Sequence, residues 1–74
     1  MQWIDAISSQ IKRFAYESEQ RKLFVQFNDG ATFVYDAVPP EKFASLKNAA
    51  SKGKYLNSDI KGKFSAHKLP HPLA

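Results

Sequence analysis

Two short apolar runs between residues 23 and 36, separated by an Asn-Asp-Gly turn, constrain the fold of this chain more than any other feature. Both runs are rich in aromatic and β-branched side chains, which predicts two antiparallel strands joined as a hairpin. With a three-residue loop and the glycine in a bulge, Val25 pairs with Phe33 and Leu23 with Tyr35, so the large apolar side chains gather on one face. A two-residue loop would move Phe33 and Tyr35 to the other face, and we therefore favour the three-residue loop.

The residues around the hairpin predict three further elements. Residues 11–17 form a strand before it, because aromatic side chains recur there with a period of two. A Val-Pro-Pro sequence stops the sheet, since proline cannot donate to a ladder, and favours a helix over residues 41–51. We expect Gly53 to end that helix in the left-handed conformation. Asn57 suits the N-cap of a very short second helix over residues 58–61.

The two ends of the chain are interpreted from their length and composition. Residues 1–8 predict a short amphipathic helical segment, which is stable only if it packs on the core or on a partner. Its apolar side is made of Trp3, Ile4 and Ile7. Residues 65–74 contain two prolines, and we expect a flexible tail. The expected fold is α+β: a three-stranded antiparallel β-meander, one helix and a short second helix over residues 9–64, preceded by the helical segment.

With 74 residues and no cysteine, the chain forms one domain that neither disulfides nor a thiolate metal site can stabilise. A domain of this size gains little net stability from one core, so association with a second copy is an ordinary remedy. The hairpin face that carries Phe24 and Val34 is expected to be partly exposed, and together with Trp3 it suggests a homodimer. The chain contains neither a membrane-spanning run nor a signal peptide, so we expect a cytoplasmic protein with no membrane partner.

The residues that could carry catalysis or bind a metal are few and poorly placed. His67 and His71 are four residues apart, but Pro70 lies between them and disfavours a helix, and no third ligand is close in the sequence. The chain also lacks a cysteine nucleophile, a serine in a strand–turn–helix elbow and a glycine-rich phosphate loop. We therefore expect a protein that is not an enzyme and that binds neither metal nor cofactor.

Charge is distributed unevenly between two parts of the chain. Residues 42–74 contain seven lysines and one acidic residue, for a net charge of +6, whereas residues 1–41 have a net charge of −2. A one-sided positive field attracts polyanions, of which nucleic acid is the commonest. Charge alone does not separate this interpretation from solvated lysines that only keep a small protein soluble.

The sequence Ser51-Lys52-Gly53-Lys54-Tyr55 combines groups that suit a nucleic-acid backbone. Two lysines flank a glycine that lets the backbone approach a ligand closely, and a tyrosine able to stack on a base follows. Lysine supplies charge without the bidentate geometry of arginine, so the pattern indicates phosphate contacts rather than base readout. The alternative is that Tyr55 packs in the core, Gly53 caps a helix and the lysines are merely exposed. The candidate binding residues are Lys47, Lys52, Gly53, Lys54, Tyr55, Lys61 and Lys63.

The order of these motifs resembles one known family. It runs through Ser9-x-Ile11, Leu23-x-Val25-x-Phe27, Val38-Pro39 and, most specifically, Ser51-Lys52-Gly53-x-Tyr55-x-Asn57. Over residues 9–64 the pattern is similar to the KTSC domain, a small module found alone in bacteria and phages and attached to the C-terminus of some lysyl-tRNA synthetases. The resemblance implies a β-meander followed by helices and, through the synthetases, contact with nucleic acid. Leu56 and Phe64 depart from the family's pattern, in which aromatic and tyrosine residues are expected.

We therefore expect a non-catalytic nucleic-acid-binding domain, with DNA slightly preferred, that acts as a small transcriptional regulator or phage accessory protein. Four or five phosphate contacts would give log affinity against log salt a slope of about −4. The alternative is a protein-interaction module that uses Phe24, Val34 and Trp3 as an apolar surface. Its binding would resist salt and be lost in Trp3→Ala or Phe24→Ser, whereas Lys52→Glu/Lys54→Glu would abolish nucleic-acid binding.

Overall fold

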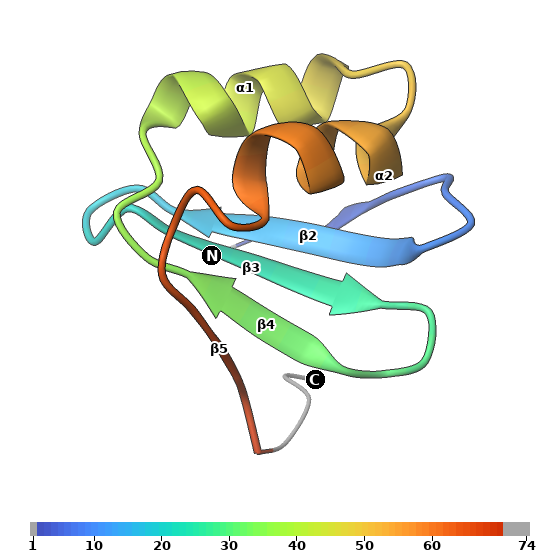
Figure 1. Cartoon of the computed structure of the whole chain (residues 1–74), viewed down its shortest axis with the longest axis horizontal. Helices are drawn as coiled ribbons and strands as arrows, with labels where there is room; N and C mark the ends of the chain where they lie inside the picture. The colour runs from blue at the N-terminus through green and yellow to red at the C-terminus, as the bar shows by residue number, and fades with distance from the viewer. Residues whose placement is uncertain (1, 71–74) are drawn as a thin grey trace.

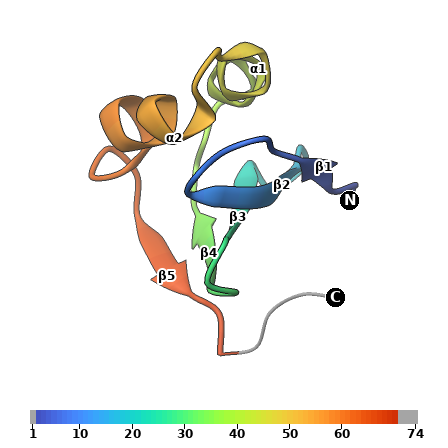
Figure 2. The same ribbon diagram turned by 90° about the vertical axis from the view of Figure 1, so that its right-hand side faces the viewer.

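The computed structural model describes residues 2–70, which form one antiparallel five-stranded sheet with helices packed on one of its faces (Figure 1). The strands follow one another in chain order, so no connection crosses the sheet. Figure 2 shows that the helices cover one face of the sheet, with β5 at the edge beside β4. The elements are β1 Ile4–Asp5, β2 Ile11–Glu17, β3 Lys22–Phe27, β4 Thr32–Tyr35, α1 Pro40–Asn48, α2 Lys52–Tyr55, the π-helical turn η1 Leu56–Ile60, and β5 Ala66–Lys68.

The central hairpin has the register that the sequence predicts. Val25 lies opposite Phe33 and Leu23 opposite Tyr35. The Phe27 amide donates to the Ala31 carbonyl at 2.8 Å, which closes a three-residue loop. The glycine of that loop, Gly30, has a φ of 93°, a conformation that costs glycine little because it has no Cβ. The three-residue loop is therefore confirmed.

The prediction of three strands is wrong, because both edges of the hairpin sheet acquire a further strand. The N-terminal segment is not helical: Ile4 pairs with Phe14 at the outer edge of β2, and alternation along β1 then turns Ile4 toward the core. At the other edge, Tyr35 pairs with Ala66, in the segment expected to be a flexible tail. Each edge offers unpaired backbone groups that a short strand can satisfy. All three residues of β5 are exposed, so apolar periodicity did not mark it.

The helices also begin and end at other residues than expected. The first ends at Asn48, and Ala49 is extended with a ψ of 139°. A continuous helix over residues 40–60 would be about 32 Å long, whereas the longest dimension of the domain is 27 Å. The break therefore allows the second helix to turn back over the same sheet. That helix begins at Lys52, where the Ser51 hydroxyl accepts from the Lys54 amide at 3.4 Å.

This arrangement corrects the two predicted cap positions. Gly53 lies inside α2 rather than after α1, and it is not in the left-handed region. Asn57 is inside η1 and does not begin a helix. The helical segment closes after Ile60 instead, where the Lys61 amide donates to the Leu56 carbonyl at 2.8 Å and Gly62 has a φ of 76°.

The core lies between the helices and the sheet, and both layers contribute fully buried side chains. These are Ile11, Phe14, Leu23, Val25, Tyr35, Val38, Leu46, Leu56 and Ile60. On the opposite face, Val34 is only 2% exposed, so its predicted partial exposure is wrong. The reason is that Val34 lies between Phe24 on β3 and His67 on β5 and is not in an edge strand. Phe24 itself is half-buried.

Candidate nucleic-acid interface

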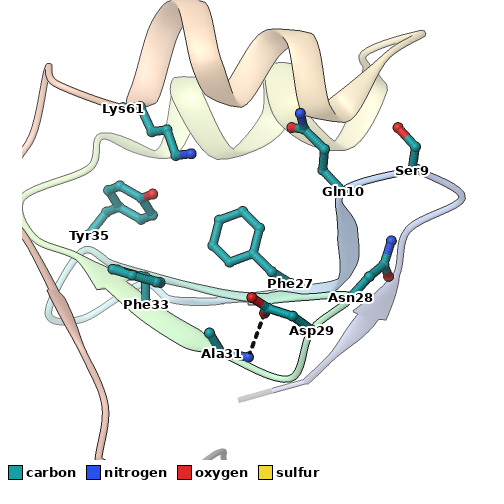
Figure 3. Close-up of a pocket in the computed structure, with 9 residues that line it drawn as sticks. All are labelled: Ser9, Gln10, Phe27, Asn28, Asp29, Ala31, Phe33, Tyr35 and Lys61. Atoms are coloured by element: carbon teal, nitrogen blue, oxygen red, sulfur yellow. Dashed lines mark hydrogen bonds between the residues drawn. The ribbon is translucent and has the colours of Figure 1, made fainter.

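An open hollow lies on the helix-covered face of the sheet, beside the end of η1 (Figure 3). We call it the aromatic hollow. Its volume is about 470 Å³. Aromatic rings from β3 and β4 form its floor, Lys61 overhangs it, and polar residues of two loops form its rim. The lining residues are Ser9, Gln10, Phe27, Asn28, Asp29, Ala31, Phe33, Tyr35 and Lys61.

The hairpin register places the three floor aromatics on the same face. Phe27 and Phe33 are half-buried, and their rings meet edge to face with centroids 5.7 Å apart. Tyr35 is 3% exposed, and its hydroxyl points toward the interior of the hollow (Figure 3). Within residues 2–70 that hydroxyl forms no hydrogen bond with another residue, and its oxygen is not among the fully buried atoms, so it is accessible from the hollow. Burial raises the pKa of Tyr35 above its ordinary value, so the hydroxyl is protonated near neutral pH and can donate a hydrogen bond.

Lys61 brings the positive charge into the aromatic hollow. It follows η1 directly, and its ammonium nitrogen lies 5.4 Å from the centroid of the Phe27 ring. The side chain is exposed and forms no ion pair with any residue that the structure describes. A ligand anion can therefore reach this ammonium group without displacing a carboxylate.

A second hollow of about 350 Å³ lies between the β1–β2 loop and the start of α2. We call it the polar hollow. It contains most of the sequence that resembles the family motif, and it shares Ser9 and Gln10 with the aromatic hollow, so the two adjoin. The side-chain amide of Asn57 on η1 donates to Gln10 Oε1 on the β1–β2 loop at 3.3 Å, at the place where the two hollows adjoin. The lining residues are Ile7, Ser8, Ser9, Gln10, Ala50, Ser51, Lys52, Gly53, Lys54 and Asn57.

Gly53 brings α2 close to the β1–β2 loop. A Cβ at this buried position would lie 3.0 Å from Gln10 Oε1 and 3.4 Å from Ser8 Oγ. The Ser8 hydroxyl is held in place because it accepts from the amides of Gln10, at 3.1 Å, and Ile11, at 3.3 Å. The glycine therefore lies where loop and helix pack closely, and it does not serve a left-handed backbone.

We expect Gly53→Ala to change the free energy of unfolding by less than about 1 kcal/mol. Alanine favours the helix by roughly 0.5–1 kcal/mol, and its Cβ meets the end of the exposed Gln10 side chain, which can move aside. Gly62→Ala is the matched control, because Gly62 has a positive φ and should lose about 1–2 kcal/mol. Urea denaturation of both variants is the measurement. A larger loss of unfolding free energy in Gly53→Ala than in Gly62→Ala would show that the loop cannot accommodate a Cβ at position 53, and the prediction would be wrong.

The structure gathers only part of the predicted binding set. Lys52, Gly53 and Lys54 line the polar hollow, and Lys61 lines the aromatic hollow. The Lys52 ammonium also donates to the Ala49 carbonyl at 3.2 Å. Tyr55 is half-buried against the core, which matches the alternative interpretation of that residue.

The remaining two lysines of the predicted set lie elsewhere. Lys47 has its ammonium nitrogen 5.6 Å from the Phe43 ring centroid on α1. Lys63 lines a separate hollow with Lys42 and Asp59. Lys42 forms an ion pair with Asp59 at 3.6 Å. The Ser58 hydroxyl, 2.6 Å from Asp59, lowers the pKa of that carboxyl, and Lys42 and Lys63 add to the effect. This corner is therefore partly neutralised.

Sequence reasoning did not include Phe27, Phe33, Tyr35 and Gln10 among the candidate residues, although they line the aromatic hollow. The signal for three of them was present, because the hairpin register already placed the aromatic rings on one face. The sequence did not indicate how much of that face the helices cover. They cover that face over β2 and leave the rings at the end of the hairpin accessible from η1, whereas Gln10 comes close only through the fold of the β1–β2 loop.

Other kinds of site find no support in the described part of the chain. Residues 2–70 contain no group of three or more His, Cys, Asp or Glu side chains that could hold a metal ion. His67 lies 3.9 Å from Asp36, and His71 is outside the described residues. No helix within the same residues is long and apolar enough to cross a membrane.

Comparisons with known proteins agree on one domain type. The model of the KTSC domain matches residues 7–64. A lysine–tRNA ligase of Nostoc punctiforme is 43% identical over 61 residues, which are 82% of this chain and 11% of the ligase. A protein of Tsukamurella paurometabola is 39% identical over 59 residues, covering 80% of this chain and 88% of that protein. The chain thus spans about a tenth of the ligase's length.

A solved structure gives the same result in three dimensions. The crystal structure of a KTSC domain protein from Yersinia pestis superposes with a TM-score of 0.86 at 35% sequence identity. The match covers 92% of this chain and 96% of that one.

Proposed function

Since this chain belongs to the KTSC domain family, and since its unpaired lysines line two adjoining hollows, we propose that it is a non-catalytic nucleic-acid-binding domain. The proposal rests on one observation: Lys52, Lys54 and Lys61 border a path that runs from the polar hollow to the aromatic hollow past Ser9 and Gln10. None of the three forms an ion pair within residues 2–70. A chain of phosphates following this path meets positive charge at both ends.

The relatives support a nucleic-acid partner. The Nostoc punctiforme relative is named for an activity on tRNA, and the present chain corresponds to a small part of it. A domain carried by such an enzyme gains from affinity for a phosphate backbone. Lysine ammonium groups bind phosphates as point charges and do not read base sequence. The proposed contacts therefore supply affinity for DNA or RNA without sequence selection.

The proposal predicts a salt-dependent affinity. Three phosphate contacts on a single strand should give log affinity against log salt a slope of about −2. This is shallower than the slope of about −4 expected from the sequence because Lys47 and Lys63 lie elsewhere and because each contact to a single strand contributes less than a contact to a duplex. Fluorescence anisotropy of labelled single-stranded DNA and RNA, titrated at increasing KCl concentration, measures the slope. A flat salt dependence, or no binding of either strand at low salt, would disprove phosphate binding at this site.

The alternative of an apolar protein-interaction surface has less support. Val34, one of its three expected residues, is buried. Trp3 is half-buried, and its ring lies 4.4 Å from the Arg13 guanidinium carbon. Within residues 2–70, the large apolar side chain that is fully exposed is Ile7, which borders the polar hollow. Homodimer formation through the second sheet face stays a prediction, with a smaller apolar surface than the sequence indicated.

A further inference from the structure

We propose that the aromatic hollow binds one unpaired nucleobase of a single strand whose phosphates follow Lys52, Lys54 and Lys61. This inference rests on the proposed function and deepens it. Phosphate contacts alone would bind duplexes and single strands alike. A base pocket instead selects unpaired nucleic acid, because a base within a duplex is covered on both faces by its neighbours and on its edge by its partner.

The size and floor of the aromatic hollow suit a planar ligand. Its volume of about 470 Å³ lies within the usual range of small-molecule sites, roughly 300–1,000 Å³. Phe27 and Phe33 are half-buried, so each ring is fixed by packing and still presents surface to the hollow. Stacking of a base on an aromatic ring contributes about 1–3 kcal/mol and tolerates any base, because every base has a π face.

The Tyr35 hydroxyl is a second, independent observation. The residue is 97% buried, its hydroxyl points into the hollow, and the oxygen has no partner within residues 2–70 (Figure 3). Within residues 2–70 the buried side-chain oxygen without a partner is Thr32 Oγ1, so the Tyr35 hydroxyl, although its ring is buried, remains accessible from the hollow. It is free to donate one hydrogen bond to a ligand acceptor. Carbonyl oxygens and ring nitrogens of nucleobases are acceptors of this kind. The floor therefore combines a stacking surface with one hydrogen-bond donor.

The rim adds groups that both donate and accept. Gln10 and Asn28 carry side-chain amides, and each already uses one atom: Gln10 Oε1 accepts from Asn57, and Asn28 Nδ2 donates to the Ser8 carbonyl at 3.2 Å. The amide nitrogen of Gln10 and the amide oxygen of Asn28 remain for a ligand. Asp29 is less available, because Oδ1 accepts from the Ala31 amide at 3.0 Å.

The charge at the mouth favours a nucleotide over an aromatic side chain of a peptide. Lys61 overhangs the floor, and the adjoining polar hollow continues with Lys52 and Lys54. A base stacked on the floor carries its own phosphates on both sides, so one ligand satisfies both hollows. A peptide would need an aromatic residue flanked by several acids to do the same.

The test compares three ligands of equal length on the wild-type protein: a single strand, an abasic strand with the same phosphates and no bases, and a duplex. Anisotropy should show the single strand binding roughly 5- to 150-fold more tightly than the abasic strand, which is the stacking contribution expressed as an affinity ratio. The duplex should bind about as weakly as the abasic strand. These measurements need no variant and so do not depend on folding of a mutant.

Variants assign the effect to the hollow. Phe33→Leu keeps an apolar side chain but removes the π face, and it should weaken binding of the normal strand while leaving the abasic strand unchanged. Phe24→Leu is the matched control, since Phe24 is a half-buried phenylalanine on the opposite sheet face. Tyr35→Phe removes only the hydroxyl and should weaken normal-strand binding roughly fivefold, the effect of one hydrogen bond.

Each outcome has a definite meaning. Equal binding of normal and abasic strands overturns the base pocket and leaves phosphate binding intact. Failure of both strands to bind overturns the proposed function as well. Equal loss in Phe33→Leu and Phe24→Leu places the effect outside the hollow and overturns the assignment. If an acidic peptide with one aromatic residue binds in a Phe33-dependent manner and the strands do not, the pocket belongs to a protein partner and the inference is wrong.

Discussion

Ile60→Ala is expected to lower the free energy of unfolding by about 2–5 kcal/mol. Ile60 is fully buried and packs η1 against the core between the helices and the sheet. Removal of its side chain loses apolar burial and leaves a cavity that the surrounding structure only partly fills. A domain of 74 residues has a total stability of roughly 4–11 kcal/mol, so the loss is a large share of the total. Urea denaturation, followed by the fluorescence of the single tryptophan, measures it.

Ile7→Ala is the matched control for that experiment. The same atoms are deleted, but Ile7 is fully exposed on the β1–β2 loop and no core contact is lost. We expect a change within about 0.5 kcal/mol. Equal destabilisation by the two variants would contradict the docking of η1 on the sheet. The comparison is also relevant to the binding experiments, because Lys61 directly follows η1 and its position depends on the packing of η1 against the sheet.

Lys54→Glu/Lys61→Glu is expected to weaken single-strand binding by roughly 100-fold, about tenfold for each reversed charge, which corresponds to a charge interaction near the weak, solvent-exposed limit. One lysine comes from each hollow, so the variant places negative charge at both ends of the proposed phosphate path. Lys52 is left in place because its ammonium donates to Ala49 at the junction between the helices. Anisotropy at low salt is the measurement, and the salt slope should flatten at the same time.

Lys12→Glu/Lys47→Glu tests whether position or total charge is responsible. Each lysine-to-glutamate change removes two charges, so both double variants lower the formal net charge from +4 to zero. Lys12 and Lys47 are exposed and line neither hollow. The control should therefore weaken binding much less than the Lys54/Lys61 variant. If the two double variants behave alike, binding is a diffuse effect of net charge and has no defined site.

The parts of the fold that were predictable depend on interactions between residues close in sequence. The hairpin is the best example, because a turn of known length and two alternating runs leave one register that buries Leu23, Val25, Phe33 and Tyr35 together. The presence of a helix next to the two prolines followed for the same kind of reason, although it begins at Pro40, one residue before the predicted start. The residues within these elements are sufficient to predict them, and packing against the rest of the chain does not change whether they form.

The elements that were predicted wrongly depend on distant partners. β1 and β5 are too short to show a period, and they are strands because β2 and β4 offer free edges to pair with. Ser51 begins a helix, and Gly53 lies inside it, because a continuous helix would extend beyond the sheet that it must cover. Local propensity around Gly53 and Asn57 pointed to caps, and packing overrode it.

The candidate site divides in the same way. Lysine content in the second half of the chain is a property of the sequence, and it suggests a polyanion partner without separating this interpretation from solvated lysines. The direction of each ammonium group is a property of the fold: Lys54 and Lys61 face the two hollows, whereas Lys63 lies in the hollow where Lys42 pairs with Asp59. Charge counts add along a chain, but a binding surface requires side chains from separate segments to meet. Here the return of the second helix over the sheet brings them together.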